Sequence, residues 1–161
     1  MLMDYLRAAL AATIASFFVS VGAQEFDLVS FNCLIGYEND DHPEICAEVR
    51  PDLKEQVAEA NRIWRARNAK ELTELRAACE ARLMRAYGGD QAKILEAKRE
   101  ARRRRADFRS QLLAAPNRDN LVDCPAYARD FAAGGERIDI QRPLIDATRD
   151  SPARPIKWPN P

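Results

Sequence analysis

The stretch from residue 52 to residue 87 contains neither glycine nor proline, the two residues that most often interrupt a helix. Positions suited to a buried stripe recur there every three or four residues, as they do along one face of an α-helix. These positions are Leu53, Val57, Ala60, Trp64, Asn68, Leu72, Leu75, Cys79, Leu83 and Ala86. The pattern predicts one helix of about 50 Å, with Asp52 as its N-cap and Gly88-Gly89 as its end.

A second helix is expected after the turn at residues 88–90, from Asp90 as N-cap to about Ala115, where Pro116 stops it. Its stripe consists of Ile94, Ala97, Ala101, Arg105, Phe108 and Leu112. Folded back on the first helix, it brings Leu83 near Ile94, Leu75 near Ala101, and Trp64 near Leu112 and Leu113. We therefore expect an all-α fold built on an elongated antiparallel helical hairpin.

The segments outside the hairpin complete the domain organisation. Residues 1–23 are expected to be a signal peptide, because the uncharged run over 8–23 is shorter than the ~20 apolar residues of a membrane span and ends in small residues. Residues 24–51 are predicted to be an irregular cysteine-bearing segment with a short helix from Pro43 or Glu44 to Val49. Residues 52–134 hold the hairpin and a short third helix over 121–133. The proline-rich residues 135–161 are predicted to form an extended, partly disordered tail.

The four cysteines all follow the predicted cleavage point, and they are Cys33, Cys46, Cys79 and Cys124. An even number of cysteines in an exported chain predicts two disulfide bonds, and there is no Cys-x-x-Cys redox pair. The spacing leaves three pairings open. We favour Cys33–Cys46, which holds the irregular segment, with Cys79–Cys124, which ties the long helix to the third one. The competing pairing of Cys33 with Cys79 and Cys46 with Cys124 is also geometrically sensible.

The loop between the first two cysteines is acidic and holds the only histidine of the chain. Its candidate ligands or contact residues are Glu38, Asp40, Asp41, His42 and Glu44. The spacing matches no EF-hand, and a single histidine is poor evidence for zinc. We interpret the loop as a solvated turn without a metal.

The run over residues 98–109 is rich in arginine, and its central members are Arg102, Arg103, Arg104 and Arg105. On a helix these four side chains spread around most of the circumference, so we interpret the run as an ion-paired, solvated surface with Glu71 and Glu74 of the facing helix among its partners. The alternative is a surface that meets an anionic partner. The whole chain has 25 basic and 25 acidic residues, and a net charge of zero argues against a nucleic-acid-binding protein.

Four short motifs resemble a known bacterial domain in their order and spacing. They are SFNC at 30–33, EICAE at 44–48, DL at 52–53 and LRAAC at 75–79. Together they resemble the lysozyme-inhibitor LprI-like N-terminal domain, a small, helical, cysteine-bearing exported domain. The chain departs from that family's pattern at Asn32, where the family has aspartate, and at residues 70–75, where the family has a tryptophan element. The resemblance covers residues 30 to about 80, and it implies binding to a lysozyme-type muramidase or another envelope partner. Lysozyme is a basic protein that the acidic loop 38–44 would contact.

These features together predict an exported binding protein of the cell envelope, periplasmic or secreted, that is not an enzyme. No set of residues resembles a catalytic constellation, and no cofactor is implied. The partner is expected to be a protein, with membrane contact only if the leader is retained. The alternative function is a structural or assembly adaptor of an envelope complex that docks through the arginine-rich helix and the proline-rich tail.

Overall fold

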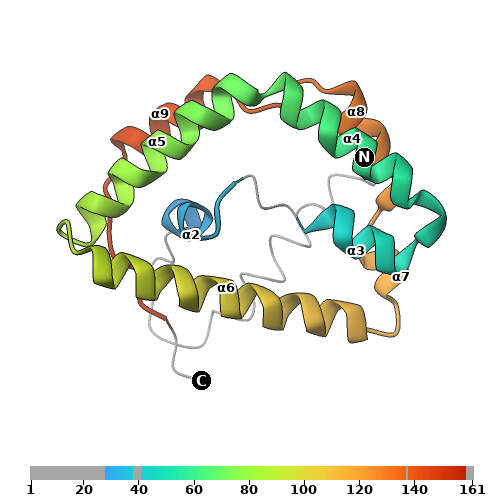
Figure 1. Ribbon diagram of the computed structural model, residues 1–161, viewed down its shortest axis with the longest axis horizontal. Helices are drawn as coiled ribbons and strands as arrows, with labels where there is room; N and C mark the ends of the chain where they lie inside the picture. The colour runs from blue at the N-terminus through green and yellow to red at the C-terminus, as the bar shows by residue number, and fades with distance from the viewer. Residues whose placement is uncertain (1–27, 38–40, 137, 159–161) are drawn as a thin grey trace.

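Every regular element is helical in the described part of the chain, which in this computed structural model comprises residues 28–37, 41–136 and 138–158 (Figure 1). The elements are α2 (Leu28–Ile35), α3 (His42–Val49), the 3₁₀ turn η1 (Pro51–Leu53), α4 (Lys54–Arg67), α5 (Ala69–Ala86), α6 (Gln91–Ala114), α7 (Arg118–Leu121), α8 (Cys124–Ala133) and α9 (Arg142–Asp150). The all-α prediction is confirmed. The expected signal peptide and two candidate acidic residues, Glu38 and Asp40, lie outside the described residues.

The long helix expected over residues 52–87 consists of two segments, α4 and α5, that meet at Asn68. The backbone N–H of Asn68 donates to the Trp64 carbonyl at 3.0 Å, and its carbonyl accepts from the Leu72 N–H at 2.8 Å, so the chain bends without a loop. The buried amide of Asn68 accepts from the Ile140 N–H at 2.8 Å and donates to the Trp64 carbonyl at 2.9 Å. The bend therefore lies where a polar side chain ties the helix to the segment that follows α8.

The helix ends follow the sequence signals with one exception. Gly88 and Gly89 have positive φ angles of 60° and 79°, and they end α5 as expected. The Asp90 carboxylate accepts from the Lys93 N–H at 3.1 Å and caps α6. The expected cap at Asp52 is wrong, because that carboxylate binds the Arg50 guanidinium and α4 begins two residues later without a side-chain cap.

The expected hairpin is open rather than tightly packed. Helices α5 and α6 contact each other only near the turn that joins them. There, Leu83 and Ile94 share a buried cluster, as predicted. Further along, α2 packs between α5 and α6, and α3 lies against both α4 and α6 (Figure 1). The expected pairs of Leu75 with Ala101 and of Trp64 with Leu112 are therefore absent. The short helix expected from Pro43 or Glu44 to Val49 is confirmed as α3, but the prediction of an irregular segment is wrong for residues 28–35, which form α2.

The described residues form three buried clusters, of which two contain one disulfide bond each and the third joins α5 to α9 through Leu75, Ala78 and Ile145. The first, called the Cys46 lobe, is built mainly by α3, α4 and α8 from Ile45, Cys46, Val49, Val57, Ala60, Val122, Cys124, Tyr127 and Ala128. The second, called the Cys33 lobe, is built by α2, α5, α6 and the C-terminal segment from Cys33, Leu34, Cys79, Leu83, Ile94, Ala97, Ala101 and Ile156. The tertiary clusters thus place the two N-terminal cysteines in different cores.

The disulfide bonds join Cys33 to Cys79 and Cys46 to Cys124, across 46 and 78 residues of sequence. The favoured pairing of Cys33 with Cys46 and Cys79 with Cys124 is wrong, and the competing pairing is present. The physical reason is that the segment between Cys33 and Cys46 is not one unit. Its two helices pack at different places along the hairpin, so each cysteine meets a partner from a distant part of the chain.

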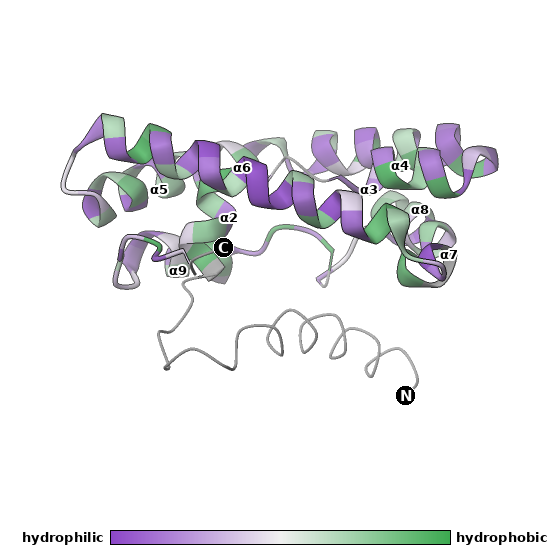
Figure 2. Cartoon of the chain, turned by 90° about the horizontal axis from the view of Figure 1, so that it is seen from below, coloured by the Kyte–Doolittle hydropathy of each residue, from purple (hydrophilic) through white to green (hydrophobic). Residues whose placement is uncertain are grey.

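The C-terminal segment folds back onto the hairpin, and the expected extended tail over 135–161 is wrong at Arg142–Asp150, which form helix α9. Helix α9 lies along α5, with Ile145 and Thr148 buried and Pro143 in its first turn (Figure 1). After α9 the chain has no regular structure, but Ile156 is buried and the Trp158 ring packs edge-on against Phe31 of α2 at 6.1 Å. Figure 2 shows mostly hydrophilic residues along α6, whose apolar positions are few. The C-terminal segment therefore adds apolar side chains to the cluster that α6 lines with only a few apolar residues.

Candidate protein-interaction surface

The arginine-rich run and the acidic segment, expected to be separate surfaces, are joined by ion pairs between α6 and the N-terminal part of α3. Arg105 Nε donates to Asp41 Oδ2 at 2.5 Å, and both side chains are largely buried. One turn later, Arg109 donates to Glu44 at 2.5 Å and to Glu48 at 2.6 Å. The prediction of an ion-paired helix is therefore confirmed for these arginines, and α3 is fastened to α6 by charge as well as by packing.

The other arginines of the run have different partners. Arg103 bonds to Glu100 at 2.7 Å and to Asp107 at 3.0 Å on its own helix. Arg104 bonds to the same Glu100 at 2.7 Å and lies over the Trp158 ring at 5.1 Å. Arg102 is exposed and makes no ion pair within the described ranges.

The facing helix does not supply the expected partners of the arginine run. Glu74, proposed as one of them, binds Arg142 of α9. The open hairpin explains this difference, because α2 and α3 separate α6 from most of α4 and α5. The carboxylates that reach the arginines come from α3 and from α6 itself.

Hydrogen bonds from arginines shift the pKa values of several groups on this surface. The guanidinium groups of Arg103 and Arg104 lower the pKa of the Glu100 carboxyl from 4.5 to about 2. The carboxylate of Glu48, followed by that of Glu44, raises the pKa of Arg109. Glu100 and Arg109 are therefore each held in their charged form by their partners.

His42 belongs to a column of aromatic rings rather than to a cluster of metal ligands. Its ring stacks on Tyr127 with the centroids 5.1 Å apart, and Tyr127 stacks on Phe131 at 3.9 Å. Phe131 in turn contacts Trp64 at 5.5 Å. In the described residues no three histidine, cysteine, aspartate or glutamate side chains are grouped as metal ligands would be. His42 thus joins α3 to α8 through ring contacts.

The acidic side of α3 remains accessible although it is ion-paired. We call Asp41, Glu44 and Glu48 the α3 acidic face. The side chains of Glu44 and Glu48 are 65% and 53% exposed, while the Arg109 side chain that they bind is mostly covered. The helix that carries them is anchored by Cys46, which is fully buried in its disulfide with Cys124. The surface therefore combines exposed carboxylates with a fixed backbone.

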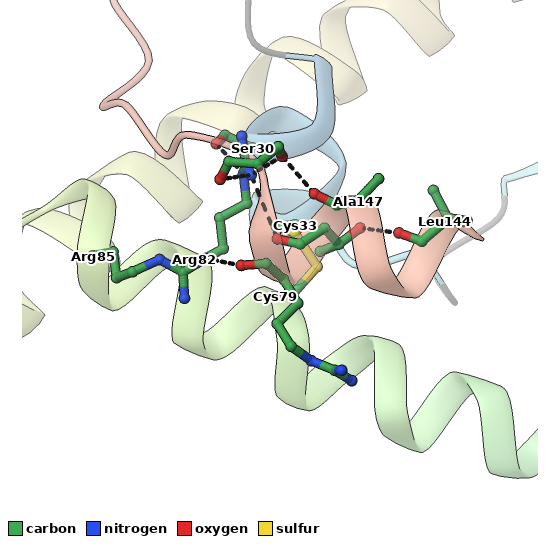
Figure 3. The surroundings of a disulfide bond; sticks show 10 residues. Ser30, Cys33, Cys79, Arg82, Arg85, Leu144 and Ala147 are labelled. Carbon is green, nitrogen blue, oxygen red and sulfur yellow. Dashed lines mark hydrogen bonds between the residues drawn. A yellow bond between two sulfur atoms is a disulfide. The ribbon is translucent and has the colours of Figure 1, made fainter. Parts of the chain in front are cut away.

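Arg82 is a buried residue whose importance the sequence reasoning missed. Only 2% of it is exposed, and its guanidinium donates to Ser30 Oγ at 2.9 Å, Ser151 Oγ at 2.7 Å and the Pro152 carbonyl at 2.8 Å (Figure 3). It thereby ties α5 to α2 and to the C-terminal segment. A signal was present, because position 82 lies three residues after Cys79 and seven after Leu75 on the buried stripe. The partners could not be found without the tertiary structure.

The two disulfide bonds indicate that the chain matures in an oxidising, non-cytoplasmic environment. No helix among the described residues is long and apolar enough to cross a membrane. Comparison with models of protein families, with curated proteins and with solved structures finds no match. The resemblance to the LprI-like domain therefore stays a prediction.

Proposed function

We propose that this chain is an exported, non-enzymatic protein of the cell envelope, periplasmic or secreted, that acts by binding another protein. The observation that carries the proposal is the α3 acidic face, in which Glu44 and Glu48 are exposed on a helix anchored by the Cys46–Cys124 disulfide. A surface that is already ordered loses little conformational entropy on binding, and its carboxylates favour a basic partner.

The partner proposed first is a lysozyme-type muramidase, which the resemblance over residues 30–80 implies. The ion pairs with Arg105 and Arg109 do not prevent such contact, because a carboxylate can accept several hydrogen bonds at once. They do reduce the negative potential of the face, so affinity must come from geometry as well as from charge. Glu38 and Asp40, which precede this face in the sequence, are proposed to extend it.

The alternative function, an adaptor, has less support. It depends on the arginine-rich helix and the C-terminal segment, and both are engaged in contacts within this chain. Arg103, Arg104 and Arg105 are engaged with carboxylates of this chain, and Trp158 packs on Phe31 and Arg104. Arg99 and Arg102 are the exposed arginines of the run that have no ion pair within the described part of the chain. Docking through the arginine-rich helix would therefore rely mainly on these two side chains, which makes the α3 acidic face the stronger candidate.

The test is an inhibition assay with the oxidised chain from residue 24 onward, titrated against a c-type lysozyme on cell-wall substrate. We expect saturable inhibition that disappears when the protein is reduced and alkylated. Absence of inhibition at high micromolar protein would contradict the muramidase as partner. A direct binding measurement with the same two proteins separates an inhibitor from a protein that binds without blocking the substrate.

The choice of variants for this assay must consider that the carboxylates of the α3 acidic face form ion pairs with arginines of α6. Asp41→Asn alone also releases Arg105, so a loss of binding would not identify which side chain made the contact. Glu44→Gln with Glu48→Gln removes the two exposed carboxylates but also releases Arg109, so Arg109→Met is measured beside it to show the effect of that release alone. Glu59→Gln is the matched control, since Glu59 is similarly exposed and also binds an arginine, Arg62, on α4. We expect the double variant to weaken binding and the control to leave it unchanged.

A further inference from the structure

A hollow of about 230 Å³ lies beside the Cys33–Cys79 disulfide, among residues of α2, α5 and α6. Both cysteines line it, and they are 5% and 6% exposed, whereas Cys46 and Cys124 have no exposed surface. A thiolate has to reach a sulfur atom to attack a disulfide, so access decides which bond reacts first. The Cys33–Cys79 bond thus borders a hollow through two cysteines that keep a little exposed surface, whereas the Cys46–Cys124 bond is fully covered by its lobe.

The described residues that line this hollow carry an excess of positive charge. Three of them are cationic, namely Arg76, Lys98 and Arg102, and one is anionic, namely Glu80. Positive charge attracts an anionic reactant and stabilises the thiolate that leaves a disulfide. Arg102, one of the exposed arginines of the run, thus lines the same hollow as the Cys33–Cys79 bond.

We infer that the Cys33–Cys79 bond is a site of thiol–disulfide exchange with small anionic thiols. The sulfur of the incoming thiolate bonds to the Sγ of one cysteine, and the Sγ–Sγ bond breaks. The electron pair of that bond leaves on the Sγ of the other cysteine, which becomes a thiolate. The products are one mixed disulfide and one free thiolate, so the step needs no reactant besides the thiol.

Exchange at this site releases α2, the element that closes the Cys33 lobe. Ser30 of α2 accepts from Arg82, and Phe31 of α2 packs on Trp158. Opening the bond therefore weakens the attachment of the C-terminal segment, while the Cys46–Cys124 bond holds the other lobe together. This inference concerns the Cys33 lobe and does not depend on the function proposed for the α3 acidic face.

The first arm of the experiment identifies the bond that reacts. The oxidised chain is incubated under native conditions with glutathione, quenched in acid at intervals, alkylated and mapped by mass spectrometry. We expect glutathione on Cys33 or Cys79 to appear at least roughly tenfold faster than any modification of Cys46 or Cys124, because buried disulfides react only after opening of the fold. Equal rates, or earlier reaction of Cys46–Cys124, would overturn the inference.

The second arm tests the preference for an anionic thiol. The rate with glutathione is divided by the rate with cysteamine, a cationic thiol, after each is normalised to its rate with an unstructured disulfide peptide. Arg102→Glu should lower this ratio about three- to fivefold, and high salt should reduce the effect. Arg99→Glu is the control, since Arg99 lies one turn away on α6 and lines a different hollow. Equal effects of both variants, or no effect of either, would overturn the assignment to anionic thiols.

Discussion

The two lobes of this protein close a small core in different ways. The Cys46 lobe is closed by apolar and aromatic contacts, with the ring column from His42 to Trp64 joining α3, α8 and α4. The Cys33 lobe is closed around a polar group, because the Arg82 guanidinium binds α2 and the C-terminal segment. A core with few large apolar residues can thus be completed by a buried cation with many hydrogen-bond acceptors.

The difference also predicts how each lobe responds to mutation and how it unfolds. Aromatic packing is lost gradually as side chains are reduced in size, whereas loss of a buried donor leaves several acceptors unsatisfied at once. The disulfide of the Cys33 lobe borders a hollow, whereas both cysteines of the Cys46 lobe's disulfide have no exposed surface. We therefore expect the Cys33 lobe to open first and the Cys46 lobe to retain its structure longer.

The largest expected effect comes from the disulfide bonds. Replacing Cys46 and Cys124 together by alanine should lower the free energy of unfolding by about 4 kcal/mol, because the bond closes a long loop of the unfolded chain. Replacing Cys33 and Cys79 should cost a similar amount in chemical denaturation. Hydrogen exchange should then show α2 and α9 unprotected in the second variant and α3 and α8 unprotected in the first. The same pattern of exchange in both variants would contradict the division into two lobes.

Arg82→Met should lower the free energy of unfolding by about 3 kcal/mol, since Ser30 loses a donor in a buried site and Ser151 and Pro152 each lose one in a partly buried site. Arg85→Met is the control, because Arg85 is an exposed arginine on the same helix, and it should cost less than about 1 kcal/mol. Thermal or urea unfolding measures both. Similar losses for the two variants would show that Arg82 is not the centre of the Cys33 lobe.

Gly134→Ala should destabilise the Cys46 lobe by about 2 kcal/mol. Gly134 ends α8 with φ of 76°, and an added Cβ would lie 2.6 Å from the Arg67 guanidinium carbon. That guanidinium donates to the Phe131 carbonyl at 2.8 Å, so its displacement also releases the end of α8. Gly135→Ala is the control for backbone strain alone, because no neighbouring atom lies near its Cβ position. Equal losses in urea unfolding would exclude the contact with Arg67 as a cause.

The ion pair between Arg105 and Asp41 should contribute about 1 kcal/mol, which is more than an exposed pair provides. A double-mutant cycle with Arg105→Met and Asp41→Asn measures this coupling. The matched cycle on Arg62 and Glu59, both exposed on α4, should give a smaller coupling energy, because solvent screens an exposed pair. A coupling energy near zero for Arg105 and Asp41 would mean that packing alone holds α3 against α6.

The smallest expected effect is a dependence of stability on acid. The pKa of Glu100 falls from 4.5 to about 2 in the folded chain, so its contribution is present above pH 4.5 and is lost as the pH falls towards 2. The free energy of unfolding of Glu100→Gln should therefore decrease less between pH 5 and pH 2 than that of the unaltered chain. Urea unfolding at several pH values measures the two slopes, and identical slopes would show that Glu100 is not held ionised by its arginines.

Much of the secondary structure could be predicted from local signals. Gly88, Gly89 and Asp90 set the turn between α5 and α6, and Pro43 set the start of α3, because turn and cap chemistry acts over a few residues. The ion-paired character of the arginine run was also predictable from its spread around a helix. The partners of Arg105 and Arg109 were not, because they lie more than 60 residues away in the sequence.

The sequence by itself determined an all-helical, disulfide-bonded chain, through helical periodicity, capping residues and an even number of cysteines. The tertiary structure determined the cysteine pairing, the position of α2 and α3 within the hairpin, the return of the C-terminal segment and the burial of Arg82. The physical reason is that periodicity shows which face of a helix is buried but not which element covers it. In this chain the covering elements are α2, α3 and α9, and their contacts depend on residues far apart in the sequence.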